Sequence, residues 1–228
     1  MSTTQRGIGT NQPSGTLEVS APAPSIFIQD TSGAPTGYIQ FEDSAGDATG
    51  YLGFDSTQSS NFSVVNIRQG GDIVLNPGFG GVVSVPVLEI TGADMAEKFP
   101  ASEKLAPGMV AAIDPNNPGK LCLSRGAYNK CVAGVVSGAN NFSVGAVLGS
   151  TAEDRDAPAI ALSGRVFVHC DASIVGIEPG DLLTTSDSEG HAMKVTDFPR
   201  AQGAIIGKAM TSLNRGKAGM VLVLVSLQ

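Results

Sequence analysis

Residues 177–182 read Ile-Glu-Pro-Gly-Asp-Leu, and residues 105–110, 72 positions earlier, read Leu-Ala-Pro-Gly-Met-Val. Two further pairs of segments keep almost the same spacing, between 71 and 73 positions. They are 119–123 (Gly-Lys-Leu-Cys-Leu) with 190–195 (Gly-His-Ala-Met-Lys-Val), and 132–136 (Val-Ala-Gly-Val-Val) with 204–209 (Ala-Ile-Ile-Gly-Lys-Ala). Three pairs of matching segments in the same order predict an internal duplication.

Each copy has the pattern of a Pro-Gly turn, a strand, a glycine turn, a second strand, a connection and a third strand. Proline presets φ for a turn and glycine supplies its left-handed position. One glycine inside each third strand, Gly134 and Gly207, indicates a bulge or a close approach of two backbones. Residues 91–228 are therefore predicted to form an internally duplicated β domain of the barrel or sandwich type.

The remaining segments of this domain fit the same fold. Strands are expected at 143–148, 159–162 and 164–169. The apolar run 220–225 is typical of a closing strand that is buried on both faces. One short helix is expected around 93–99.

Residues 25–90 are predicted to form a thin module of short strands, beginning with 25–29. Residues 36–43 (Thr-Gly-Tyr-Ile-Gln-Phe-Glu-Asp) match residues 49–56 (Thr-Gly-Tyr-Leu-Gly-Phe-Asp-Ser), with a turn between them, which predicts a hairpin. A second hairpin is expected from strands at 62–68 and 72–75 joined at Gly70-Gly71. So small a sheet gains stability by packing against copies of itself, so we expect a homotrimer.

Residues 1–24 are rich in Ser, Thr, Gly, Pro and Gln, which is typical of a flexible arm. In an assembled particle such an arm anchors the chain to a neighbouring protein. Charge also divides the chain, because no lysine occurs before Lys98. We therefore expect a domain boundary within 86–100.

The composition excludes several classes of protein. Of the 228 residues, 42% are hydrophobic and only 15% are charged, which favours a folded, assembled protein over a free monomer. A net charge of −7 weighs against a nucleic-acid partner. No apolar run approaches 18 residues, so no membrane span is expected. The first eleven residues lack the apolar core of a secretion signal.

Several polar clusters could carry chemistry, and each has a simpler interpretation. Ser186, Asp187 and His191 have the residue types of a hydrolytic triad but lie within six positions in one loop. The acids Asp94, Glu97 and Glu103 and the segment 153–156 (Glu-Asp-Arg-Asp) are interpreted as solvated charge, not as acid–base pairs or cation ligands. Three further candidates lack the sequence context that their chemistry needs. They are a nucleophilic Lys208, the glycosylation patterns at Asn61 and Asn141, and a phosphate loop at 77–81.

The cysteines and histidines do not predict a metal centre. Cys122, Cys131 and Cys170 are an odd number without paired spacing, which favours reduced, buried thiols. Two histidines are too few for most histidine-based sites. His169 and Cys170 are strand neighbours, so their side chains point to opposite faces. We expect no catalytic residues, cofactor or metal.

Two parts of the chain resemble bacteriophage fibre proteins. The N-terminal part is similar to the thin trimeric β modules of tail fibres. The segments that carry this resemblance are 27–31 (Phe-Ile-Gln-Asp-Thr), 51–54 (Tyr-Leu-Gly-Phe) and 71–77 (Gly-Asp-Ile-Val-Leu-Asn-Pro). Residues 92–226 resemble a C-terminal domain of phage and bacterial fibre proteins. The matching segments are 92–99 (Gly-Ala-Asp-Met-Ala-Glu-Lys-Phe), 133–137 (Ala-Gly-Val-Val-Ser), 161–166 (Ala-Leu-Ser-Gly-Arg-Val), 180–186 (Gly-Asp-Leu-Leu-Thr-Thr-Ser) and 206–209 (Ile-Gly-Lys-Ala).

The resemblance implies a non-enzymatic structural protein of the virion, a fibre or appendage that contributes to assembly and host-surface attachment. Its expected partners are two further copies of itself, other virion proteins bound through residues 1–24, and a host receptor or glycan. Some relatives of the C-terminal domain are intramolecular chaperones that cleave themselves after trimer assembly, which leaves that role as an alternative. A bacterial surface protein that binds carbohydrate is the third.

Overall fold

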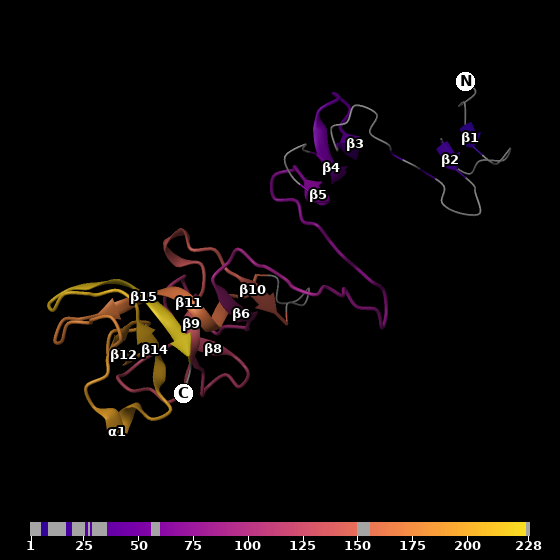
Figure 1. Ribbon diagram of the computed structural model, residues 1–228. Helices are drawn as coiled ribbons and strands as arrows, with labels where there is room; N and C mark the ends of the chain where they lie inside the picture. The colour runs from indigo at the N-terminus through magenta and orange to yellow at the C-terminus, as the bar shows by residue number, and fades with distance from the viewer. Residues whose placement is uncertain are drawn as a thin grey trace. The chain divides into compact units, whose positions relative to one another are not determined.

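The computed structural model describes residues 6–8, 17–19, 26, 28, 36–55, 60–149 and 156–226. The chain divides into two compact units, Met1–Val85 and Pro86–Gln228, which are described separately. Nearly all regular structure in the described residues is β, with two short helical turns (Figure 1). The prediction of strand-built folds for residues 25–90 and 91–228, and so of an all-β fold class, is confirmed.

Two small sheets are present in the described part of the N-terminal unit. In the first, β1 (Arg6–Ile8) pairs in parallel with β2 (Leu17–Val19). Both strands belong to the predicted anchoring arm, most of which lies outside the described residues. The strand expected at 25–29 is described only at residues 26 and 28, and neither is in a strand.

The second sheet confirms the predicted hairpin of the two sequence repeats. Strands β3 (Gly37–Glu42) and β4 (Ala48–Phe54) pair antiparallel, and β5 (Ser63–Asn66) pairs with the other edge of β4. The Asp43 carboxylate closes the turn, because its Oδ1 accepts hydrogen bonds from the backbone N–H groups of Ala45 at 2.8 Å and Asp47 at 3.0 Å.

The second predicted hairpin does not form within the unit. A turn is present, closed by the bond from Gly71 N to Arg68 O at 3.0 Å, but residues 72–75 are not in a strand. No described residue between 67 and 93 belongs to a strand or helix. The apolar residues of this stretch therefore lack strand pairing in the described part of the chain, although their composition favours strands.

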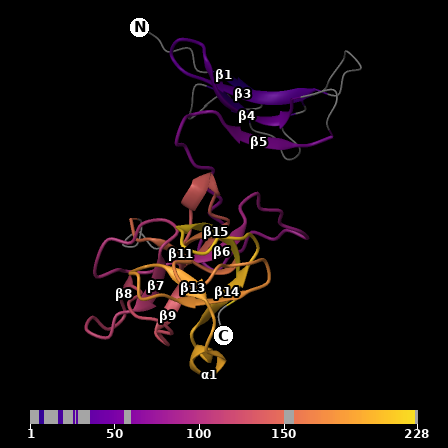
Figure 2. The same ribbon diagram turned by 90° about the vertical axis from the view of Figure 1, so that its left-hand side faces the viewer.

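The C-terminal unit contains a closed five-stranded barrel, whose strands can be followed in Figures 1 and 2. Its strand order is β13-β12-β14-β15-β11, and a parallel pairing of Cys170 with Ala192 joins β11 back to β13. All other neighbours in this ring are antiparallel. The strands are β11 (Ala159–Asp171), β12 (Leu182–Thr185), β13 (Ala192–Lys194), β14 (Ile205–Ala209) and β15 (Ala218–Ser226).

The preceding residues repeat this strand order and share β11 with the barrel. Here β8 pairs with β7, β7 with β9, β9 with the start of β11, and β11 with β6. A parallel bridge between Ala101, three residues after the end of β6, and Leu121 joins this part of the chain back to β8. The new strands are β6 (Asp94–Lys98), β7 (Val110–Ile113), β8 (Leu121–Leu123) and β9 (Val132–Val136). We call β6–β9 with the start of β11 the first half, and β11–β15 the second half.

The register of the strands supports the duplication residue by residue. Ala111 pairs with Gly134 in the first half, and Leu183, 72 positions after Ala111, pairs with Gly207 in the second half. Each pair is followed at once by a β-bulge. The expected close approach of backbones is also present. A Cβ on Gly134 would lie 2.6 Å from the carbonyl oxygen of Ala161, and a Cβ on Gly207 would lie 2.1 Å from that of Leu224.

Two expectations for this unit were wrong. Residues 94–98 form strand β6 and not a helix, because Asp94 and Ala96 alternate inward and the strand pairs with both β10 (Ala146–Leu148) and β11. Strand β15 is not buried on both faces: Val221 and Val223 are buried, but Leu224 is 45% exposed. A barrel wall has one interior face, so apolar residues alternate inward and outward along the run.

The two remaining elements are short turns of helix. A 3₁₀ turn, η1 (Ala139–Asn141), follows β9. The helix α1 (Phe198–Ala201) lies between β13 and β14, with Pro199 in its first turn. The Asp197 side chain caps it by accepting a hydrogen bond from Arg200 N at 3.2 Å.

Candidate functional site

A cavity of about 470 Å³ opens on the first half, beside the turn that follows β7. Asp114 dominates one side of it. Its carboxylate accepts hydrogen bonds from Ser102 Oγ at 2.5 Å, Asn117 Nδ2 at 2.9 Å and Asn116 N at 2.8 Å. These donors, Ser102 above all, lower the pKa of Asp114 to about 2.

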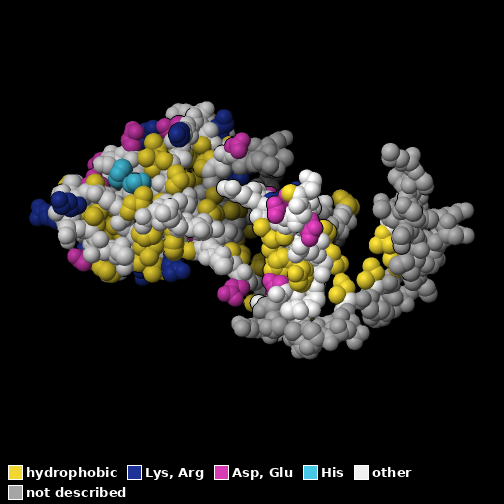
Figure 3. Space-filling model, turned by 90° about the horizontal axis from the view of Figure 1, so that it is seen from above, with side chains coloured by type: hydrophobic (Ala, Val, Ile, Leu, Met, Phe, Trp, Pro, Cys, Tyr) yellow, Lys and Arg dark blue, Asp and Glu magenta, His cyan; other side chains and the backbone are white. Residues whose placement is uncertain are grey.

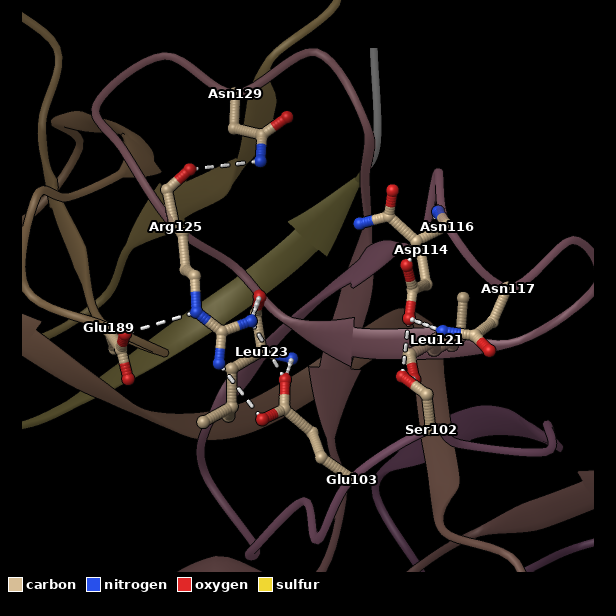
Figure 4. A network of polar contacts seen from close by, with 10 residues as sticks. All are labelled: Ser102, Glu103, Asp114, Asn116, Asn117, Leu121, Leu123, Arg125, Asn129 and Glu189. Atoms are coloured by element: carbon tan, nitrogen blue, oxygen red, sulfur yellow. Dashed lines mark hydrogen bonds and ion pairs between the residues drawn. The ribbon is translucent and has the colours of Figure 1, made fainter.

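The other side of this cavity carries a charged network. Arg125 makes a two-pronged contact with the Glu103 carboxylate, both distances being 2.9 Å, and its Nε donates to Glu189 at 3.0 Å (Figure 4). Glu103 also accepts a bond from Leu123 N at 2.9 Å. All of these polar groups are satisfied by one another. The arrangement therefore holds the loops together, and its carboxylates are not free to act as acids or bases.

A second cavity of about 450 Å³ occupies the equivalent place in the second half. Cys122 in the first cavity corresponds to Met193 in the second, and Asn129 to Arg200, each 71 positions apart. The duplication thus reproduces the cavity as well as the strands, although the side chains that line the two differ.

Each cavity contains a hydrogen bond between a serine and an aspartate, but the serine and the aspartate have exchanged places between the two halves. In the first half Ser102, after β6, donates to Asp114, after β7. In the second half the acid, Asp171, ends β11, and Ser186 after β12 donates to it at 3.4 Å. Hydrogen bonds from Ser173 and from Ser186 and Ser188 lower the pKa of Asp171 to about 2. Asp114 therefore links the chain after β6 to the chain after β7, and Asp171 links the end of β11 to the chain after β12.

Tyr128 fastens the connection between β8 and β9 onto the second half. Its hydroxyl oxygen accepts hydrogen bonds from the backbone N–H groups of Thr196 at 3.0 Å and Asp197 at 2.8 Å. Its ring is buried against Val195 and neighbouring apolar residues, and the Arg200 guanidinium lies 4.5 Å from the ring centre. Burial and satisfied hydrogen bonding make Tyr128 an anchor between the halves.

Ser186, Asp187 and His191 do not form a triad. Ser186 Oγ donates to Asp171, and Asp187 Oδ1 accepts a bond from Ala127 N at 2.9 Å. The Nδ1 of His191 donates to the carbonyl oxygen of Glu189 at 2.7 Å. The three side chains are held by other groups, as expected of a polar hairpin loop.

The acids near the domain junction are not all solvated, which corrects the expectation for Asp94. Asp94 is only 7% exposed, and its Oδ1 accepts a hydrogen bond from Gly145 N at 2.7 Å, while its buried Oδ2 has no partner. Glycines allow this burial, because a Cβ on Gly145 would lie 2.1 Å from Asp94 O. Glu97 is half-buried and Glu103 is paired with Arg125. A sequence pattern with two nearby lysines could not reveal the burial.

The other candidates lie at the surface. Lys208 is exposed, as its interpretation as a solvated amine requires. Asn61 and Asn141 are also exposed. Residues 77–81 form an exposed turn with no helix after it. Of the acidic segment 153–156, only Asp156 is described, and it is exposed.

The cysteines are free, and they differ in burial. Cys170 is fully buried, and this burial raises the pKa of its thiol to about 12. Cys122 is half-buried and Cys131 is exposed, so the expectation of buried thiols holds only for Cys170. Among the described residues, no group of three or more His, Cys, Asp or Glu side chains could hold a metal ion. Within the same residues, no helix has the length and apolar character needed to cross a membrane.

An apolar surface of the N-terminal unit lies on one side of the sheet β3–β5. The pairing places Ile39 opposite Leu52 and Leu52 opposite Val64, so their side chains share a face. Phe54 and Phe62 are in edge-to-face contact, with ring centres 5.3 Å apart. We call this surface the apolar face; its members are Ile39, Phe41, Leu52, Phe54, Phe62 and Val64. Tyr38 and Tyr51 contact each other on the opposite side.

Comparison with known proteins adds no relationship, because neither the protein-family models nor the curated proteins contain a match to this chain.

Proposed function

We propose that this protein is a structural component of a phage virion, a fibre or appendage that assembles as a homotrimer and contributes to particle assembly and host-surface attachment. The observation that supports this best is the exposed apolar face of the N-terminal unit. Phe41 is 56% exposed, Phe62 60% and Val64 52%. Contiguous apolar surface of this kind marks an interaction site.

The sheet cannot bury this face by itself. It has three strands and no second layer within the described residues of its unit, and such sheets are marginal without packing against another element. Burying each large apolar side chain contributes roughly 1.5–3 kcal/mol. Copies of the same chain, related by symmetry, offer the face a partner of matching chemistry.

The stretch after this sheet supports the same assembly. Val74, Val82 and Val87 are each about four-fifths exposed or more, and Phe79 is fully exposed. Residues 72–91 have a strand-like, apolar sequence but form no strand in the described part of the chain. Pairing with other copies would satisfy their backbone groups and cover their side chains.

A pair of matched variants tests the trimer. Phe41→Asp places a charge on the apolar face, whereas Gln40→Asp places it at the next position of β3, on the opposite side. In light scattering of the full chain, Phe41→Asp is expected to dissociate the oligomer and Gln40→Asp to leave it intact. An oligomer that survives both changes would show that the apolar face is not the interface.

Two further measurements address the virion role. A chain without residues 1–24 should still assemble but should not be incorporated into the parent particle, because the arm is proposed to bind a neighbouring protein. The purified oligomer should also compete with the particle for adsorption to the host. Normal incorporation of the truncated chain would contradict the anchoring role.

A second candidate is an intramolecular chaperone that cleaves itself near the domain junction. The buried carboxylate of Asp94, with its unpartnered Oδ2, favours it, since an unsatisfied buried polar atom calls for an explanation. A denaturing gel separates the two: self-cleavage gives two fragments in the wild-type chain and one intact band in Asp94→Asn. An intact wild-type chain in the assembled state leaves the adhesive fibre as the better account.

A further inference from the structure

The two histidines of the chain meet at the surface of the second half. His169 in β11 and His191, directly before β13, lie side by side, because the adjacent residues Cys170 and Ala192 pair in parallel. Their ring centres are 5.5 Å apart and their planes are inclined by 51°. Figure 3 shows the histidine side chains together at the surface. Both are half-buried.

Each ring has one nitrogen held by a backbone carbonyl group. His191 Nδ1 lies 2.7 Å from Glu189 O, and because a carbonyl oxygen only accepts, this nitrogen carries the proton. His169 is hydrogen-bonded to the backbone of Pro107, which has no N–H, so the ring again donates. In the neutral form of each ring, the second nitrogen is a lone-pair acceptor. Histidines that bind metals are oriented in this way.

The separation of the rings fits a tetrahedral metal ion. A ring nitrogen lies roughly 1.2 Å from its ring centre and about 2.0–2.1 Å from Zn²⁺, so two imidazoles at the tetrahedral angle have centres about 5.3 Å apart. A right-angled pair, as in square-planar or octahedral sites, would bring the centres to about 4.6 Å. The observed 5.5 Å is close to the tetrahedral value.

The surroundings keep both ligands available. Two carboxylates lie two positions from a histidine along the chain, and both are held by other groups. Glu189 is bound to Arg125, and Asp171 accepts hydrogen bonds from Ser173 N, Ser186 Oγ and Ser188 Oγ.

We propose that His169 and His191 form a two-imidazole site for Zn²⁺, with water completing the coordination. Such a site links β11 to β13 at the seam that closes the barrel, next to the Pro107–Gly108 turn of the first half. The ion would displace water from the two free nitrogens, and no proton needs to leave the protein. Binding then favours the closed barrel over the unfolded chain.

The test is titration of the full chain with Zn²⁺ alone at pH 7.5, by calorimetry. One ion per chain is expected to bind, and His169→Gln and His191→Gln should each weaken binding by no less than about tenfold, because losing even a group that only orients a ligand costs 10–100-fold. Cys131→Ser, which removes an exposed thiol at a different cavity, should leave the affinity unchanged.

Two further readouts distinguish this site from adventitious binding. Imidazole NMR signals of both histidines should shift together on addition of Zn²⁺, and the thermal midpoint should rise in the wild type but not in either histidine variant. Binding that survives both histidine substitutions, or that disappears with Cys131→Ser, would overturn the proposal. So would the absence of saturable binding at one ion per chain.

Discussion

The strand glycine Gly207 offers the sharpest test of the duplicated fold. A Cβ built there lies 2.1 Å from the carbonyl oxygen of Leu224 and 2.9 Å from Val225 Cα, both of which are backbone atoms of β15. Real Cβ atoms essentially never come closer than 3.0 Å, so the Gly207→Ala variant must push the two strands apart by about 0.9 Å. The displaced backbone carries the ladder between β14 and β15.

The expected cost combines two contributions. Overpacking of a well-ordered contact costs about 1–3 kcal/mol. The backbone at Gly207, with φ of +159°, adds strain of about 1–3 kcal/mol for any residue with a side chain. We therefore expect Gly207→Ala to reduce the free energy of unfolding by about 2–5 kcal/mol. Gly134→Ala should behave alike, because its Cβ would lie 2.6 Å from Ala161 O.

Gly203→Ala is the matched control, because its φ is +76° but no atom lies within 4 Å of the added Cβ. It should cost only the left-handed backbone penalty of about 1–2 kcal/mol. Thermal unfolding of the full chain followed by circular dichroism measures all three, with roughly 2–4 °C expected per kcal/mol. If Gly207→Ala is no more destabilising than Gly203→Ala, the close approach of β14 and β15 does not exist.

Two other predictions follow from the anchors and the acids. Tyr128→Phe leaves the N–H groups of Thr196 and Asp197 without an acceptor and should cost about 1–3 kcal/mol in urea unfolding; the exposed Tyr38→Phe is the control, and equal stabilities would refute the anchoring role. The lowered pKa values of Asp114 and Asp171, both about 2, predict a stabilising contribution that is complete above about pH 4 and is lost as the pH falls through 2. Thermal midpoints measured from pH 7 to pH 2 should show this fall, and Asp171→Asn should make it shallower; an unchanged slope in that variant would contradict the assignment.

The elements that could be predicted from the sequence are those whose conformation depends on residues close together in the chain. The Pro-Gly turns at Gly108 and Gly180 have φ of +85° and +93°, which only glycine adopts without strain. The repeat at 36–43 and 49–56 alternates apolar and polar residues, so both its strands and their shared face could be recognised.

What sequence could not show depends on contacts between distant strands. The closure of the barrel at Cys170 and Ala192 and the bridge from Ala101 to Leu121 join strands that no local pattern connects. The burial of Asp94 depends on Gly145, 51 positions away. The pairing of His169 with His191 likewise appears only once β11 lies beside β13.

The apolar stretch 82–90 illustrates a different limit. Its composition favours a strand, but in the described residues of one chain it has no strand to pair with and its side chains are exposed. Strand propensity reflects packing against neighbours more than a backbone preference. In the proposed trimer, the pairing partners of this segment would be strands of the other copies.

The mass of the native oligomer tests the central claim most directly. The chain has a mass of 23.2 kDa, so native mass spectrometry or light scattering of the full chain at micromolar concentration should give about 70 kDa, three chains, or a multiple of it. A stable monomer of 23.2 kDa with a cooperatively folded β3–β5 sheet would contradict the account, because the apolar face would then be stable in water without a partner.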